Sequence, residues 1–334
     1  MATAGKPLRP AVSYRFNTET SEDDNGLSAF APVRPRLYGI AYRMLGSAAE
    51  AEDIVQDVWL RWQSMNRSAV ENPPAYLATT TTRLCINLAQ AAHTRRETYI
   101  GQWLPEPVDT SSDPGLGAER GEALKLAVLL LLEKLSPTER AAYVLREAFD
   151  YPYSQIAEIL NAEEANVRQL VSRARKHIAD GRCTSVSPGE QRRFLEAFIV
   201  AAQKGDMAGL EAVFTEDVVS YSDGGGLVRA ARVPVSGRKR VATFICAVST
   251  HFWKGVTLEW IEINRQTGVL MSRDGLPVAL ATVDASEQGI NQIMWMLRPS
   301  KLAAISIRAK RARLADASLQ WSERFSSITA TRPL

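Results

Sequence analysis

Residues 136–178 read "SPTERAAYVLREAFDYPYSQIAEILNAEEANVRQLVSRARKHI", and this stretch predicts three helices in close succession. Ser136 can cap the first helix, Pro137 suits its first position, and Glu139 can complete a capping box. Between the second and third helices, Asn161 tolerates the left-handed backbone of a tight turn. A short helix, a tight turn and a longer helix are typical of a helix-turn-helix unit.

The last of these helices predicts one buried face and one polar face. Its apolar residues recur at helical spacing and form one stripe: Val167, Leu170, Val171, Ala174 and Ile178. The opposite face carries the residues that we expect to meet duplex DNA: Arg168, Gln169, Ser172, Arg173 and Lys176. Arginine and glutamine can read base edges in the major groove, whereas the later cations suit phosphates. The alternative is a solvated basic helix in any small bundle.

The composition favours a soluble, cytoplasmic protein of two or three domains. The chain has 334 residues, of which 46% are hydrophobic and 23% charged, so sizeable cores can be buried. Its net charge of +3 is too small to indicate nucleic acid by itself. Three widely spaced cysteines, Cys85, Cys183 and Cys246, disfavour disulfides and a zinc site. We expect no metal, no cofactor, no signal peptide and no membrane segment.

Changes in composition and hydrophobic pattern along the chain predict a multidomain protein, with two all-α domains followed by an α+β domain. Regular structure should lapse wherever proline, glycine and serine accumulate. The predicted divisions are a disordered tail at 1–28, a helical domain at 29–98, a linker at 99–121, a second helical domain at 122–182, an α+β domain at 188–302 and a tail of unknown role at 303–334.

In the first helical domain, residues 49–63 predict an amphipathic helix. Ala51, Val55, Val58 and Trp62 form its apolar stripe. The other face carries acidic and amide groups around an exposed leucine: Asp53, Gln56, Asp57 and Leu60. This pattern fits a basic partner surface with an apolar centre. A soluble helix with one stray leucine is an equally good interpretation.

The same domain ends in a cluster of cations beside aromatic rings. His93, Arg95 and Arg96 precede Tyr99 in the sequence. Rings can stack on unpaired bases while cations hold the backbone, so the cluster suits single-stranded or melted nucleic acid. By itself this signal is weak.

In the third domain, "SYSDGGGLVRAAR" at 220–232 places three glycines between two alternating runs. Glycines at such a turn predict a hairpin whose backbone approaches a neighbour closely. A helix from about 238 to 251 and runs such as "VTLEWIEIN" predict a curved antiparallel sheet packed on helices. Only His251 and Asp223 offer acid–base groups here, so we predict no catalytic residue.

Taken together, these motifs resemble the bacterial extracytoplasmic-function (ECF) sigma factors. "AEDIVQDVWLRW", "NPPAYL" and "RRETY" resemble their region 2, and residues 136–177 resemble their region 4. "YIGQWLPEP" at 99–107, "SDGGG" at 222–226 and "RPSKL" at 298–302 resemble a subgroup with a fused C-terminal SnoaL-like domain. The resemblance covers residues 29–302. The SnoaL-like domain implies a cone-shaped fold with a pocket.

The resemblance implies a role for each group of residues. Asp53, Gln56, Asp57 and Leu60 would bind core RNA polymerase, through its beta and beta-prime subunits. The melted −10 element would be held by Thr79, Arg83, Asn87, His93, Arg95 and Arg96, and the −35 duplex by Arg168, Gln169, Ser172, Arg173 and Lys176. A regulatory contact would join the linker to the glycine turn through Trp103, Leu104, Pro105, Glu106, Asp223, Gly224, Gly225 and Gly226. The fused domain would replace a separate anti-sigma factor.

The sequence departs from the family at two places. Leu88, Gln90 and His93 stand where arginines are common, and fewer phosphate contacts should flatten the salt dependence of binding. Arg298 and Ser300 alter the usual "NPDKL" motif. Two alternatives to a sigma factor remain at this point. One is a SnoaL-like enzyme tethered to a DNA reader, and the other is a ligand-sensing regulator that binds duplex DNA unaided.

Overall fold

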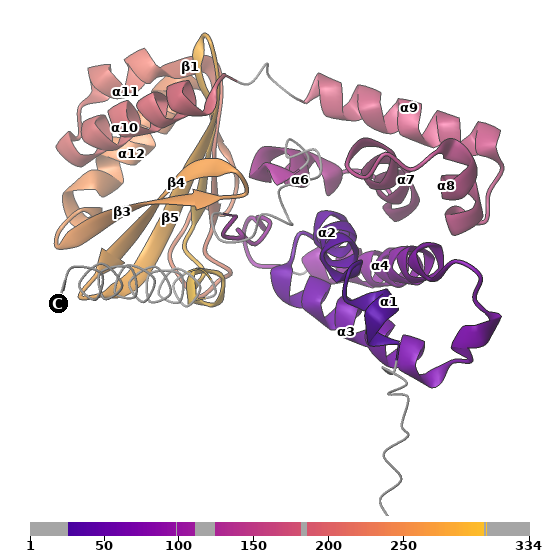
Figure 1. The fold of residues 1–334 in the computed structure, drawn as a ribbon. Coiled ribbons are helices and arrows are strands. Elements are labelled where there is room, and N and C mark those ends of the chain that lie inside the picture. Colours follow the sequence, from indigo (N-terminus) through magenta and orange to yellow (C-terminus); the bar gives the residue numbers. More distant parts are fainter. Residues whose placement is uncertain (1–25, 98, 111–123, 182–185, 304, 306–334) are drawn as a thin grey trace, which may run out of the picture.

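The computed structural model describes residues 26–97, 99–110, 124–181, 186–303 and 305, with the side chains of 92–97 left out of that description. Figure 1 shows two groups of helices and, beside them, a sheet with helices packed against it. This arrangement confirms the predicted fold class of two helical domains and an α+β domain. The two predicted tails lie almost wholly outside the described residues. No helix in the described ranges combines the length and apolar character needed to cross a bilayer.

The first helical domain consists of α1 (Leu27–Phe30), α2 (Arg34–Leu45), α3 (Ala48–Ser64), a 3-10 turn (Arg67–Ala69) and α4 (Pro73–Glu97). Ser47 begins α3 by accepting a hydrogen bond from the Glu50 amide at 3.3 Å. The predicted stripe of α3 is confirmed, because Ala51, Val55, Val58 and Trp62 are all buried.

The second helical domain consists of α6 (Leu126–Leu132), α7 (Pro137–Glu147), α8 (Tyr153–Leu160) and α9 (Glu164–Asp180). The predicted capping box of Ser136 and Glu139 is present at the start of α7. Asn161 adopts the left-handed conformation, φ 51°, between α8 and α9. The predicted apolar stripe of α9 is buried throughout. Local sequence signals therefore set the helix-turn-helix.

The C-terminal domain packs α10 (Pro188–Lys204), α11 (Met207–Val213) and α12 (Arg238–Phe252) against one six-stranded sheet. Its strands are β1 (Phe214–Asp223), β2 (Val235–Ser236), β3 (Val256–Ile263), β4 (Gln266–Arg273), β5 (Leu276–Ser286) and β6 (Gly289–Met296). They lie in the order β2-β1-β6-β5-β4-β3. Strands β3 to β6 form a meander, as alternating runs predict.

The sheet departs from the expected antiparallel arrangement in one respect, and the expected hairpin is short. The sheet is mixed, because the chain passes through α12 and the meander before β6 returns parallel to β1. The glycine turn also opens no long hairpin, since only Val235 and Ser236 pair back onto β1. The Gly224 carbonyl instead accepts from the amides of Leu227 and Val228, each at 3.1 Å, and this tight turn leads the chain away from β1.

The two helical domains pack closely against each other. Arg140 donates to the Met44 carbonyl at 2.6 Å and to Glu133 at 2.8 Å, and the Arg43 guanidinium lies 4.9 Å from the centre of the Phe149 ring. One apolar core runs through both domains and reaches the sheet at Ile263. A second core lies between the sheet and α10 to α12.

Candidate nucleic-acid interface and linker clamp

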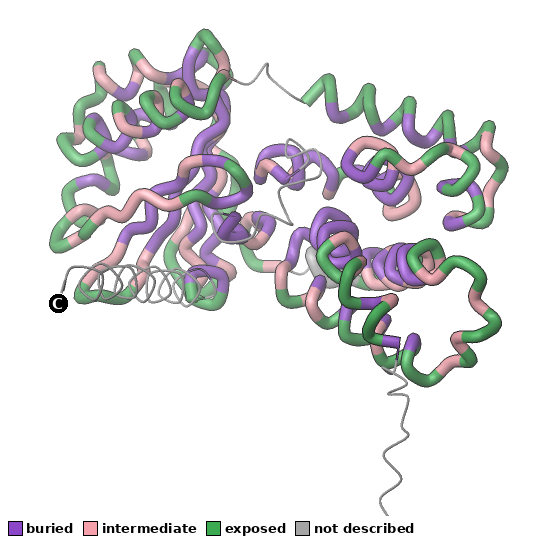
Figure 2. The backbone as a smooth tube through the Cα atoms, in the orientation of Figure 1, coloured by how far each residue is buried: buried purple, intermediate pink, exposed green. Residues whose placement is uncertain are grey.

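The outer face of α9 presents every residue that we expect to meet duplex DNA. Figure 2 shows this helix exposed along its outer side, and Gln169, Ser172 and Lys176 face solvent. Arg168 pairs with Glu164 and lies 4.6 Å from the centre of the Tyr153 ring, while Arg173 lies 3.4 Å from Glu139. Exposed ion pairs of this kind contribute only about 0–1 kcal/mol each. These guanidinium groups can therefore exchange their partners for phosphates or bases.

The candidate −10 residues on α4 are only partly open to solvent. Thr79 is half-buried and donates to the Ala75 carbonyl at 2.8 Å, whereas Asn87 is exposed. Arg83 donates to the carbonyls of Ile159, at 3.0 Å, and Glu158, at 3.3 Å, at the end of α8. The helix-turn-helix thus occupies this arginine. The side chains of His93, Arg95 and Arg96 lie outside the described residues.

The candidate polymerase surface is the outer face of α3. Asp53, Gln56 and Asp57 are all exposed, and Leu60 is 53% exposed in their midst. The structure therefore groups these four residues on one acidic face with an apolar centre. A basic partner with an apolar contact patch is complementary to it.

The linker meets the C-terminal domain at a cluster that we call the linker clamp, with Leu104, Asp223 and Lys301 buried and Tyr99 and Arg298 half-buried. The Asp223 carboxylate is fully buried and accepts from the Tyr99 hydroxyl at 2.6 Å, the Leu104 amide at 3.0 Å and Lys301 Nζ at 2.7 Å. Lys301 also donates to the Leu104 carbonyl. Both peptide groups of Leu104 thus bind one buried ion pair.

Burial shapes the electrostatics of the clamp. It lowers the pKa of Lys301, and the nearby Asp223 carboxylate opposes that change. Burial also raises the pKa of Tyr99 to about 12, assisted by its hydrogen bond to Asp223. Tyr99 therefore keeps its proton and remains a donor to the carboxylate near neutral pH. Arg298, one of the residues that departs from the family motif, donates to the Tyr99 hydroxyl at 3.2 Å.

The glycines let the turn lie directly against the linker. A Cβ on Gly225 (φ +58°) would lie 3.0 Å from the Tyr99 hydroxyl, and one on Gly226 (φ +73°) would lie 3.0 Å from Ile100 Cβ. Beside them, Gln102 donates to the Ala231 carbonyl at 2.8 Å and accepts from the Ser222 amide at 3.2 Å. A side chain at either glycine would push the linker away.

A second set of contacts, the amide hub, joins the linker to both helical domains. It consists of Tyr42, Val108, Leu124 and Asn264. Asn264 accepts from the Val108 amide at 2.9 Å, and its Nδ2 donates to the Tyr42 hydroxyl and the Leu124 carbonyl, each at 2.8 Å. Asn264 is fully buried, so these bonds satisfy polar groups that water does not reach.

Between clamp and hub, the predicted linker residues contact the first helical domain. Glu106 accepts from the Ala48 amide at 2.8 Å at the start of α3. Leu104 and Pro105 are buried, and Lys301 Nζ lies 4.8 Å from the centre of the Trp103 ring. The linker therefore connects all three parts of the described chain.

Sequence reasoning missed the hub and the role of Lys301. Lys301 lies in the quoted "RPSKL" motif, which signalled the segment but not its partner. Asn264 gave no signal, because its partner Tyr42 is 222 residues away in the chain. The two acid–base candidates do not converge: His251 is exposed, and Asp223 is engaged in the clamp.

Comparisons with known proteins place both helical domains in one family. Residues 29–96 match Sigma-70 region 2, and residues 125–178 match Sigma-70 region 4. The chain is 36% identical over 300 residues to the ECF RNA polymerase sigma factor SigJ of Mycobacterium tuberculosis, covering 86% of this chain and 96% of SigJ. It is 34% identical over 207 residues to the probable ECF sigma factor SigI of the same organism, covering 61% of this chain and 71% of SigI.

The crystal structure of M. tuberculosis SigJ is also similar over most of the chain. It matches with a TM-score of 0.68 and 29% identity, covering 84% of this chain and 99% of SigJ. The likeness therefore extends beyond the two helical domains into the C-terminal sheet.

Proposed function

Because this chain belongs to the ECF RNA polymerase sigma factors, we propose that its C-terminal domain restrains promoter binding in cis through the linker clamp. A sigma factor acts in transcription initiation with core RNA polymerase and promoter DNA, and it is not an enzyme. The observation that carries the proposal is the seating of Leu104, from the linker between the two sigma domains, on the Asp223–Lys301 ion pair.

Within that function we assign the exposed face of α9 to the −35 element. Arg168, Gln169, Ser172, Arg173 and Lys176 all lie on this face. On α4 we assign Thr79, Arg83 and Asn87 to the −10 element, together with His93, Arg95 and Arg96. On α3 we assign Asp53, Gln56, Asp57 and Leu60 to the beta and beta-prime subunits of polymerase. The protein would then act in the cytoplasm, where polymerase meets the promoter.

The packing of the two sigma domains supports restraint. Arg83 of the first domain is bonded to the end of α8 in the second, and Arg140 of the second is bonded to Met44 of the first. In this arrangement a candidate −10 residue is occupied by the −35 domain. Because the fused domain holds the linker, we propose that it replaces a separate anti-sigma factor.

Run-off transcription with purified core polymerase tests the assignment of α9. Replacing Arg168 by alanine should lower output from a promoter carrying its −35 element roughly tenfold, since a base-reading arginine usually contributes about 1–3 kcal/mol. Arg192→Ala is the matched control, since both arginines pair with a glutamate four residues away and lie over an aromatic ring. Equal effects of the two changes would contradict the assignment.

The same assay tests restraint by the clamp. Asp223→Ala combined with Lys301→Met removes both charges together, so no buried charge is left alone. We expect run-off output to rise several-fold, while the free energy of unfolding falls by about 1–3 kcal/mol because the peptide groups of Leu104 lose their partners. Unchanged or lower output from a stable variant would show that the clamp does not restrain the sigma domains.

A further inference from the structure

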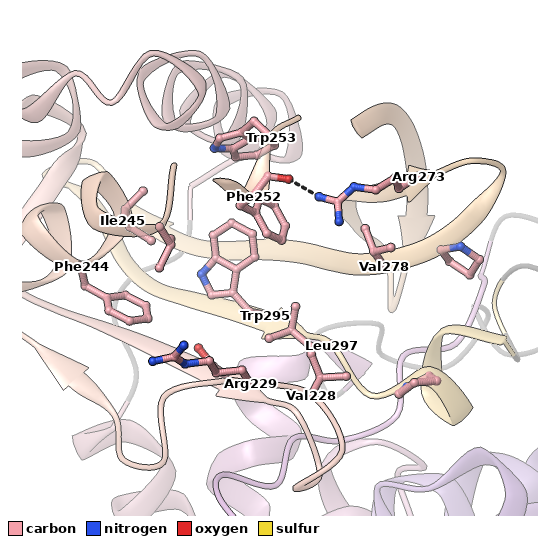
Figure 3. Close-up of a pocket in the computed structure, with 14 residues that line it drawn as sticks. Val228, Arg229, Phe244, Ile245, Phe252, Trp253, Arg273, Val278, Trp295 and Leu297 are labelled. Carbon is pink, nitrogen blue, oxygen red and sulfur yellow. Dashed lines mark hydrogen bonds between the residues drawn. The ribbon is translucent and has the colours of Figure 1, made fainter. Parts of the chain in front are cut away.

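The C-terminal domain contains an apolar cavity of about 430 Å³, a volume in the usual range for small-ligand sites. Figure 3 shows aromatic and aliphatic side chains from α12, β5 and β6 around it. The apolar walls come mainly from Phe244, Ile245, Val248, Phe252, Val278 and Trp295. Val248, at 41% exposure, and Leu276, next to the lining residue Pro277, extend the apolar surface to the outside. An apolar molecule would gain most of its binding free energy from these walls.

The charges on the cavity wall are all of one sign. Its lining includes Arg229 and Arg273 and no aspartate or glutamate. The Arg273 guanidinium is already bound to the backbone of the cavity wall, since it donates to the carbonyls of Phe252 at 2.6 Å and Lys254 at 3.1 Å. Arg229 lines the cavity while its residue remains exposed to solvent, and within the part of the chain that the structure describes no ion pair or hydrogen bond holds it. An anionic group on the ligand would complement it.

One buried donor in the cavity wall also lacks an acceptor among the described residues. Trp295 is 7% exposed, and its indole Nε1 has no hydrogen-bond partner there. Edge contacts with Phe198 and Phe252 fix the ring, and Figure 3 shows its nitrogen on the side nearer Phe244, another lining residue. A buried N–H without a partner is costly, so a ligand oxygen at this position would be favoured.

We propose that this cavity binds a small apolar molecule carrying one anionic group, such as a medium-chain or aromatic carboxylate. The chain or ring packs between Phe244, Phe252 and Trp295. The carboxylate lies toward Arg229, and the Trp295 indole donates to one of its oxygens. Binding needs neither polymerase nor promoter.

The cavity also shares backbone with the linker clamp. Ser222 and Leu297 line the cavity; Ser222 precedes Asp223 on β1, and Leu297 follows Met296, the β6 residue that pairs with Asp223. The Leu297 amide donates to the Asp223 carbonyl at 2.8 Å, and the Ser222 amide donates to Gln102 of the linker at 3.2 Å. A ligand that contacts Ser222 and Leu297 therefore changes how firmly the linker is held. This coupling, unlike binding itself, rests on the proposed function of the clamp.

Binding is tested on the full chain with the fluorescent probe anilinonaphthalene sulfonate, displaced by octanoate or by octanol. Octanoate should displace the probe at a concentration about tenfold lower than octanol, because only octanoate carries a charge for Arg229. Arg229→Gln should abolish that preference, while Arg240→Gln, a charge loss outside the cavity lining, should retain it. Val248→Trp should fill the cavity and abolish displacement by both compounds.

Each result decides a separate point. Equal displacement by octanol and octanoate would overturn the anionic class, and saturable octanoate binding to a folded Val248→Trp variant would overturn the location. Trp295→Phe keeps an aromatic ring but removes the indole N–H, and it should weaken octanoate binding about fivefold. If Val248→Trp does not fold, unchanged octanoate binding by Trp295→Phe overturns the location instead. Octanoate should also slow amide hydrogen exchange at Leu104, whose N–H is donated to Asp223. If the protein supports normal transcription but binds neither octanoate nor the probe, the ligand proposal is wrong and the proposed sigma function stands.

Discussion

The linker is held at two places by opposite chemistry. At the clamp, a fully buried carboxylate and a buried ammonium group bind the peptide groups of Leu104. At the hub, a neutral amide binds Val108, Leu124 and Tyr42. Buried charges must recover a large desolvation cost from each other, whereas a neutral amide with all partners present carries no such cost. The hub is therefore suited to fix the linker, and the clamp to release it.

The largest effect should come from breaking the ion pair on one side. Asp223→Ala leaves Lys301 charged and buried without its carboxylate, and we expect the free energy of unfolding to fall by about 3–5 kcal/mol. Urea unfolding of the full chain measures it. Adding Lys301→Met should recover part of the loss, since no lone charge then remains although the peptide groups of Leu104 still lack their partners. A loss under about 1 kcal/mol would show that the pair is not buried in solution.

Breaking the hub should cost less, because no charge is stranded. Asn264→Ala leaves the Val108 amide and the Leu124 carbonyl without partners, and we expect a loss of about 2–3 kcal/mol in the same measurement. Asn161→Ala is the control, since Asn161 has nearly the same left-handed backbone (φ 51° against 50°) but caps α8 at the surface. Equal losses at the two asparagines would attribute the effect to backbone conformation alone.

A pH titration should sharpen the comparison, since Tyr99 titrates in the clamp. The folded-state pKa of Tyr99 is raised from 10.0 to about 12. A raised folded pKa means that the contribution of Tyr99 is fully present below pH 10 and is lost as pH rises from 10 to 12. The stability difference between the wild type and Tyr99→Phe should therefore shrink over that interval. A constant difference would show that the pKa of Tyr99 is not raised in the folded protein.

The smallest expected effect is at the glycine turn. Gly226→Ala should cost about 1 kcal/mol, from a positive φ and from contact with Ile100. Gly275→Ala is matched in φ (+74° against +73°), with nothing within 4 Å of its added Cβ. Only Gly226→Ala should change run-off output, because only it displaces the linker. Equal changes in run-off output from the two variants would show that contact between the glycine turn and the linker has no role in regulation.

Features set by neighbouring residues could be predicted from the sequence, and features set by distant ones could not. The Ser136 capping box, the Asn161 turn and the α9 stripe depend on residues within one or two turns of each other, and all are present. The parallel pairing of β1 with β6 depends on how the whole meander folds back, so the alternating pattern alone gave the wrong arrangement.

The candidate site shows the same division. Exposure of Asp53, Asp57 and Leu60 follows from helical periodicity and was predicted. The hydrogen bonds of Arg83 to the end of α8 join residues 76 and 75 positions apart, so no local pattern indicates them. The glycine turn was marked as a place of close approach, but its hairpin pairs only through Val235 and Ser236, because the Gly224 carbonyl accepts from the amides of Leu227 and Val228 and the chain turns away from β1.

Under the proposed −10 role of Arg83, its bonds to α8 make promoter DNA a competitor of the protein's own second domain. If Arg83 holds the −10 strand, each promoter that it binds must first displace Ile159 and Glu158. The apparent affinity for DNA is then the intrinsic affinity multiplied by the fraction of molecules in which the two domains have separated. At a strong promoter, the −10 strand would bind Arg83 tightly enough to displace α8 without help. Transcription from a weak promoter would instead depend steeply on anything that loosens the linker.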